Sequence, residues 1–146
     1  MPSESSLIEA SWSTSPSRLS ELSEHRDKGV RAAVAHNPAT PTAVLERLAA
    51  DKHHLPRYGV AQNADPRSWK ITLQARDPDV RVILAQRHDL DERTLQRLLG
   101  DPNYRVRESL AASSRRTKLI AELAGDEHAS VRSTAALSEV LAQDDL

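Results

Sequence analysis

Apolar residues recur along the chain in two alternating kinds of short segment. The first kind carries two Leu or Ile residues three positions apart and usually closes on an Asp. Its copies are Leu19/Leu22, Leu45/Leu48 with Asp51, Leu95/Leu98 with Asp101, and Ile120/Leu123 with Asp126. Another copy keeps Ile71 and Asp77 but has Gln74 at the second apolar position. This spacing predicts short helices with one buried side.

The second kind of segment is a helix of two or three turns that opens with Val-Arg. In five copies an Arg is followed four residues later by an Ala. The pairs are Arg31/Ala35, Arg57/Ala61, Arg81/Ala85, Arg107/Ala111 and Arg132/Ala136. In one copy Pro56 replaces the Val, which fits the first turn of a helix. Successive arginines are 26, 24, 26 and 25 residues apart.

This regular period predicts an all-α solenoid of about five short helical repeats of 24–26 residues, in which each repeat buries its apolar side against its neighbours. Gly100 and Gly125 precede the closing Asp in two copies. A left-handed glycine is expected there, because it ends a helix at low cost.

The repeated arginine falls on the side of the helix that is expected to be buried. With Val30 at zero and about 100° per residue, Arg31 lies near 100°, between Val34 near 40° and Ala35 near 140°. A buried Arg needs a partner, and acids stand four to six residues upstream of each one. These acids are Asp27, Asp51, Asp77, Asp101 and Asp126. We expect a ladder of internal salt bridges; the alternative is a phosphate-binding stripe formed by the same arginines.

Composition excludes several kinds of site. Only 3% of the 146 residues are aromatic, so the core must consist of Ala, Leu, Val and Ile. The chain has no cysteine, which excludes a disulfide framework and any cysteine-bound iron–sulfur cluster or zinc. The sequence shows neither a signal peptide nor an apolar run of roughly 18 residues. We therefore expect a cytoplasmic protein with no membrane contact.

Charge and composition also vary along the chain. Residues 1–27 carry a net charge of −3, residues 28–126 of +5 and residues 127–146 of −3. The basic middle could attract an acidic partner, although a mixed solvated surface explains it as well. Residues 1–17 are rich in Ser and are expected to be mobile, with Leu7, Ile8 and Trp12 able to dock on the first repeat. Residues 18–146 are expected to form the repeat domain, with a C-terminal capping helix.

Residues 30–51, VRAAVAHNPATPTAVLERLAAD, resemble the repeat of the leucine-rich repeat variant family. The resemblance covers roughly residues 18–137. It implies a right-handed superhelix of α-helices and short 3₁₀ or α segments. The family is also associated with an N-terminal cysteine-bound iron–sulfur module, which a chain without cysteine does not carry over. HEAT repeats are a second resemblance, through Asp-Pro-Asp-Val-Arg at 77–81, but HEAT units are longer.

No residues combine into a catalytic or metal-binding motif. The six His residues include no HExxH and no i, i+4 pair, and the four Gly residues form no phosphate-binding loop. His53 and His54 lie in a predicted loop and are interpreted as solvated. Asp89, Asp91 and Glu92 precede a helix, where acids usually serve in capping. We expect no enzymatic activity, no metal and no cofactor.

The function expected from a repeat array is binding of another macromolecule, most simply a protein. Positions on the Val-Arg helices that vary between copies are the candidates for this surface. Trp69 is either an anchor for the partner or a filler for the apolar residue missing at Gln74. The candidate partner-binding residues are Tyr58, Gln62, Trp69, Val82, Gln86 and Glu108.

Nucleic-acid binding is the alternative function, and it would use arginines of the basic middle. These are Arg47, Arg67, Arg87, Arg97, Arg115 and Arg116. Binding of that kind falls steeply with salt concentration. Scarce aromatics and acidic chain ends count against it. A third possibility, an enzyme similar to the HEAT-like DNA glycosylases, lacks the catalytic carboxylate and aromatic cleft it would need. The oligomeric state is unknown.

Overall fold

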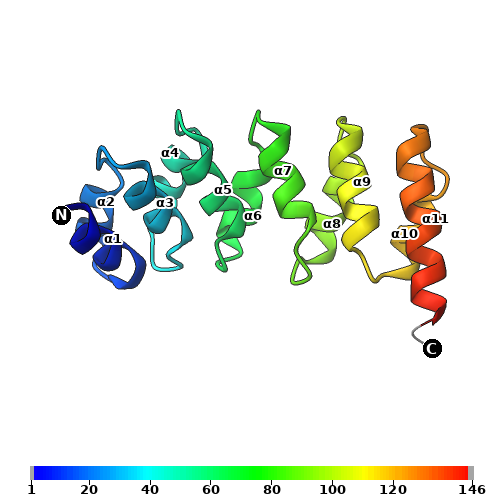
Figure 1. Ribbon diagram of the computed structural model, residues 1–146, viewed down its shortest axis with the longest axis horizontal. Helices are drawn as coiled ribbons and strands as arrows, with labels where there is room; N and C mark the ends of the chain where they lie inside the picture. The colour runs from blue at the N-terminus through cyan, green and yellow to red at the C-terminus, as the bar shows by residue number, and fades with distance from the viewer. Residues whose placement is uncertain (1, 145–146) are drawn as a thin grey trace. The chain divides into compact units, whose positions relative to one another are not determined.

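The computed structural model describes residues 2–144, and all regular structure in that range is helical (Figure 1). The helices are α1 (Pro2–Trp12), α2 (Pro16–Leu22), α3 (Lys28–His36), α4 (Thr42–Ala49), α5 (His54–Gln62), α6 (Arg67–Leu73), α7 (Pro78–Ala85), α8 (Glu92–Leu99), α9 (Tyr104–Ser113), α10 (Thr117–Leu123) and α11 (Ala129–Asp144). The all-α prediction is confirmed. The handedness of the superhelix and the number of repeats stay predictions.

The backbone divides into two compact units, Met1–Ala75 and Arg76–Leu146. In the first unit α3 packs between α1 and α5, while α2, α4 and α6 form the second layer. In the second unit α9 packs between α7 and α11, with α8 and α10 in the second layer. The helices of the first layer include every Val-Arg segment, and those of the second layer carry the paired Leu and Ile residues.

Side chains in the loops start these short helices at defined residues. Asp27, Asp77 and Asn103 each accept a hydrogen bond from the backbone N–H two residues later, at 2.7, 2.9 and 2.9 Å. Pro16 and Pro78 occupy first-turn positions of α2 and α7, where a missing N–H costs nothing. The helix ends differ from expectation. Gly100 has φ −92° and ψ 13°, and no described glycine has a positive φ.

The paired apolar residues form the core, as their spacing predicts. Leu19, Leu45, Leu98, Ile120 and Leu123 are among the most completely buried side chains. In the copy with Gln74 at the second apolar position, other side chains fill the core. Its Ile71 is only partly buried, and Trp69 from the same helix is 8% exposed. Trp69 therefore lies in the core, which favours the packing interpretation over an anchor for a partner.

The N-terminal residues form helix α1, where their composition predicted a segment without stable structure. Its buried contact is made by Ala10, next to α3. The segment packs on α3 of the first repeat, but Leu7, Ile8 and Trp12 are 43, 61 and 67% exposed, so it docks through Ala10 and not mainly through these three side chains. A small side chain at residue 10 suits the contact between α1 and α3, because Asn37 at the end of α3 donates a hydrogen bond to the backbone carbonyl of Ala10.

Helices α3 and α5 approach so closely that residue 59 has no room for a side chain. A Cβ atom on Gly59 would lie 2.7 Å from Cβ of Ala35 and 2.9 Å from the carbonyl oxygen of Ala32. Both neighbours are parts of a rigid helix and cannot rotate away. Gly59 therefore permits the packing of α3 against α5, a role that no feature of the sequence pattern indicated.

Replacing Gly59 with alanine is expected to lower the free energy of unfolding by about 1–3 kcal/mol, because the two helices must separate. Urea unfolding followed by far-UV circular dichroism measures the change. Gly100→Ala is the matched control, since a Cβ there meets its nearest atoms at 3.9 Å and the backbone is not left-handed. Equal stabilities of the two variants would contradict the close approach at residue 59.

Candidate interaction surface

At three places an arginine with a largely buried side chain forms an ion pair with an aspartate about twenty residues downstream. Nε of Arg31 lies 2.8 Å from Oδ2 of Asp51, and Nε of Arg107 lies 2.7 Å from Oδ2 of Asp126. Arg81 donates to Asp101 in the same way, at 2.7 Å. In all three pairs Nη2 also reaches the second carboxylate oxygen. The bidentate geometry is the strongest that an arginine and a carboxylate can form.

The prediction of buried ion pairs is confirmed for these arginines, but the predicted partner is wrong. Arg31 pairs with Asp51 and not with the upstream Asp27, whose carboxylate caps α3 through the N–H of Gly29. The same aspartate serves two arginines in different ways. The carboxylate of Asp101 binds Arg81, and its backbone carbonyl accepts from Nη1 of Arg107 at 2.7 Å.

This double use of one aspartate recurs within each unit. The carbonyl of Asp51 accepts from Nη1 of Arg57 at 2.7 Å, and that of Asp126 from Nη1 of Arg132 at 2.8 Å. Arg132 is exposed, so its predicted burial is wrong. These arginines therefore donate to a backbone carbonyl six residues upstream, at the start of their own repeat. Arg31, Arg81 and Arg107 also bind the aspartate carboxylate that precedes the next repeat.

Hydrogen bonding sets the protonation of the pair in the second unit. The guanidinium of Arg107 lowers the pKa of Asp126, and the carboxylate raises the pKa of Arg107 in return, in each case against the opposing effect of burial. Both groups are therefore charged at neutral pH. The guanidinium is occupied by protein acceptors, which counts against a phosphate-binding stripe formed by these buried arginines.

A second set of links between repeats comes from two buried asparagines that the sequence pattern did not reveal. Nδ2 of Asn63 donates to the carbonyls of Ala35 and Asn37 at 2.7 and 3.0 Å. Nδ2 of Asn37 donates in turn to the carbonyls of Ala10 and Ser13, both at 2.9 Å. Their spacing of 26 residues, equal to one repeat, was the signal that could have identified them.

The candidate partner-binding residues fall on the first-layer helices of both units, apart from Trp69. In the first unit Gln62 is exposed and Tyr58 half-buried on α5. The ring centre of Tyr58 lies 5.1 Å from that of His54. In the second unit Gln86 is exposed at the C-cap of α7 and Val82 is half-buried one turn earlier. Glu108 on α9 is half-buried and hydrogen bonds Ser130 of α11.

The structure gives most of the six arginines of the nucleic-acid alternative an acidic neighbour. The ion pairs are Arg47 with Glu24, Arg67 with Asp65, Arg87 with Asp89, and Arg116 with Glu92. Arg97 and Arg115 are exposed. Pairing lowers the positive potential that a phosphate backbone would meet, so the arrangement favours a mixed surface over a nucleic-acid interface.

Of the three acidic residues before Leu95, Asp91 caps α8 and Glu92 lies in its first turn, as expected of acids at a helix start, whereas Asp89 pairs with Arg87. Asp91 accepts a hydrogen bond from the N–H of Thr94 at 2.8 Å, and hydrogen bonding from the Thr94 side chain, followed by that from this N–H, lowers the pKa of its carboxyl. Across residues 2–144, no three His, Asp or Glu side chains gather in a way that could hold a metal ion. Within that range no helix is long and apolar enough to cross a membrane.

Paired layers of short helices, joined at three places by an arginine–aspartate pair of the same geometry, define an all-helical repeat protein. The family model described as leucine rich repeat variant matches residues 29–53, which confirms the resemblance seen in the sequence. No curated protein and no solved structure matches the chain.

Proposed function

We propose that this protein is a non-enzymatic repeat scaffold that binds another protein through its first-layer helices. The observation that carries the proposal is the contrast between two sets of positions on those helices. Buried positions repeat, as in Val30, Val80 and Val106, and the Arg–Asp pairs fix their spacing. The exposed positions differ from copy to copy, as a surface freed from packing allows.

The exposed positions offer the groups that a protein partner would contact. His36 on α3 and Gln62 on α5 lie one turn after Ala32 and Tyr58 on neighbouring helices of the first unit. In the second unit the equivalent exposed residues are Gln86, Ala112 and Leu137. A half-buried tyrosine beside amide side chains supplies both apolar area and hydrogen bonds, as protein interfaces require.

Photo-crosslinking tests the proposal at single residues. A photoreactive amino acid at Gln62 is expected to capture a defined protein from cells that express the full chain. The matched position is Glu46, which is exposed on α4 of the second layer in the same unit. Substituting Tyr58 by alanine should reduce capture about tenfold or more. Equal capture from both positions, or none from Gln62, would contradict the proposed surface.

A further inference from the structure

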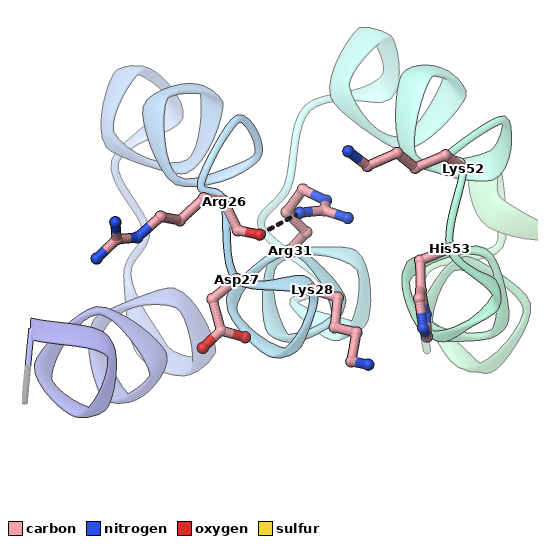
Figure 2. A pocket seen from close by; sticks show the side chains of 6 residues that line it. All are labelled: Arg26, Asp27, Lys28, Arg31, Lys52 and His53. Atoms are coloured by element: carbon pink, nitrogen blue, oxygen red, sulfur yellow. Dashed lines mark hydrogen bonds between the residues drawn. The ribbon is translucent and has the colours of Figure 1, made fainter.

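A pocket in the first unit lies where the loops before α3 and α5 come together. Its lining residues are Arg26, Asp27, Lys28, Arg31, Lys52 and His53. Figure 2 shows Lys52 extending from the loop before α5 toward the guanidinium of Arg31, while Lys28, the first residue of α3, extends away from that guanidinium on the side of His53. The side chain of Arg26 extends away from the other five. Two loops one repeat apart therefore bring several cationic groups together.

The negative charges near this pocket are already engaged. Asp51 binds Arg31 through both carboxylate oxygens, and Asp27 caps α3 through the N–H of Gly29. Lys28 and Lys52 are exposed and form no ion pair with any residue of the described range. Arg31 uses four of its five N–H donors, on Asp51 and on the carbonyls of His25 and Arg26. The pocket is left with an excess of positive charge.

The fold does not require the two lysines, as the other repeats show. The Arg107–Asp126 pair has the same geometry, but Tyr104 and Glu127 stand where the first unit has Lys28 and Lys52. The ring centres of Tyr104 and His128 there lie 3.8 Å apart in a stack, whereas Lys28 and His53 at the equivalent positions of the first unit line the pocket. Around Arg81 the corresponding residues are prolines, Pro78 and Pro102. The lysines are therefore available for another role.

His53, at the edge of the pocket, has an imidazole that is partly desolvated and lies near positive charges. The pKa of its imidazole is lowered by desolvation and by the nearby charges of Lys28, His54 and Arg31, against the opposing effect of Asp51. Nδ1 of His53 accepts the N–H of Leu55 at 3.2 Å and so caps α5. The remaining nitrogen, Nε2, is the one that carries the proton in the neutral ring.

We propose that this pocket binds a phosphomonoester dianion, held by Lys28 and Lys52 with a contribution from His53. A phosphomonoester has about two negative charges and three acceptor oxygens, and so matches several separate donors around one concavity better than a single carboxylate does. This proposal is independent of the proposed scaffold function. Tyr58 does not line the pocket, so the Tyr58→Ala variant that tests the scaffold function leaves every lining residue of the pocket in place.

The test follows the imidazole resonances of His53 by NMR during pH titrations with and without inorganic phosphate. A bound anion favours the imidazolium, so the pKa of His53 should rise when phosphate is present. By linkage, the affinity for the phosphate dianion, calculated from total phosphate with allowance for the second pKa of phosphate itself, should increase as the pH falls through the pKa of His53. The variant K28A/K52A should lose the shift and bind phosphate at least about tenfold more weakly.

The control variant K70A/K118A removes the same two charges from exposed positions outside the pocket. It should keep the shift of the intact chain. Far-UV circular dichroism checks that both variants are folded. No rise in the pKa of His53 with phosphate, or an equal rise in both double variants, would overturn the proposal.

A second pair of titrations identifies the source of the phosphate group. A phosphoserine peptide that binds more tightly than inorganic phosphate, with its serine counterpart inactive, indicates a phosphorylated protein. Equal affinity for the phosphoserine peptide and for inorganic phosphate indicates that the natural ligand is a small free anion. Binding of the unphosphorylated peptide as tightly as the phosphopeptide would contradict recognition of a phosphomonoester.

Discussion

The variant Arg107→Ala is expected to lose about 3–5 kcal/mol of unfolding free energy. The substitution leaves the carboxylate of Asp126 without its counter-charge. Water cannot compensate for the loss, because only 10% of that side chain is exposed. It also removes the donor 2.7 Å from the carbonyl of Asp101. An uncompensated charge inside a protein costs far more than the pair itself contributes. Urea unfolding followed by far-UV circular dichroism measures the loss.

Two further variants separate this cost from the loss of an ordinary surface arginine. Arg97→Ala, at an exposed position on α8, should change stability by less than about 0.5 kcal/mol. The double variant Arg107→Met/Asp126→Leu should recover most of the loss, because no charge remains buried. Equal small effects of Arg107→Ala and Arg97→Ala would mean that the buried pair does not hold the repeats together.

The second large effect is expected from Asn63→Asp, a substitution that hardly changes side-chain volume. Nδ2 of Asn63 donates to two backbone carbonyls, and the residue is completely buried. Aspartate would place a carboxylate oxygen against the carbonyl oxygens of Ala35 and Asn37. We expect a loss of about 3 kcal/mol or more, from two lost hydrogen bonds and one buried charge.

The same chemical change at Asn103 provides the control. Asn103 caps α9 by accepting the N–H of Arg105, and it donates no side-chain hydrogen bond to a carbonyl. Asp27 and Asp77 already occupy the corresponding position in other repeats. The free energy of unfolding of Asn103→Asp should therefore lie within about 0.5 kcal/mol of that of the natural chain. A similar loss in both variants would contradict the role assigned to Asn63.

Much of the helical layout was predictable from the spacing of apolar residues. Leu45 and Leu48 face the core because residues three apart share one side of a helix, whatever surrounds that helix. The burial of Arg31 followed from the same geometry, since it lies between Val34 and Ala35 on the helix surface. These properties are local, so the order of residues along one helix is sufficient to predict them.

The candidate site was less predictable. Tyr58, Gln62, Val82 and Gln86 lie on first-layer helices as expected, but Trp69 is buried. Which side chain fills the space left by a missing leucine depends on neighbours from other repeats. The basic pocket was not predicted at all, because Lys28 and Lys52 are 24 residues apart and come together only when α3 packs beside α5.

The sequence by itself determined the helical class, the repeat period and the side of each helix that is buried. Those features depend on interactions within one repeat or on a pattern copied between repeats. Only the tertiary structure decided that Arg31 pairs with Asp51 rather than Asp27, and that Gly59 and Asn63 join neighbouring helices. The physical reason is that hydrogen bonds and close contacts select partners by distance in space, which separation along the chain does not reveal.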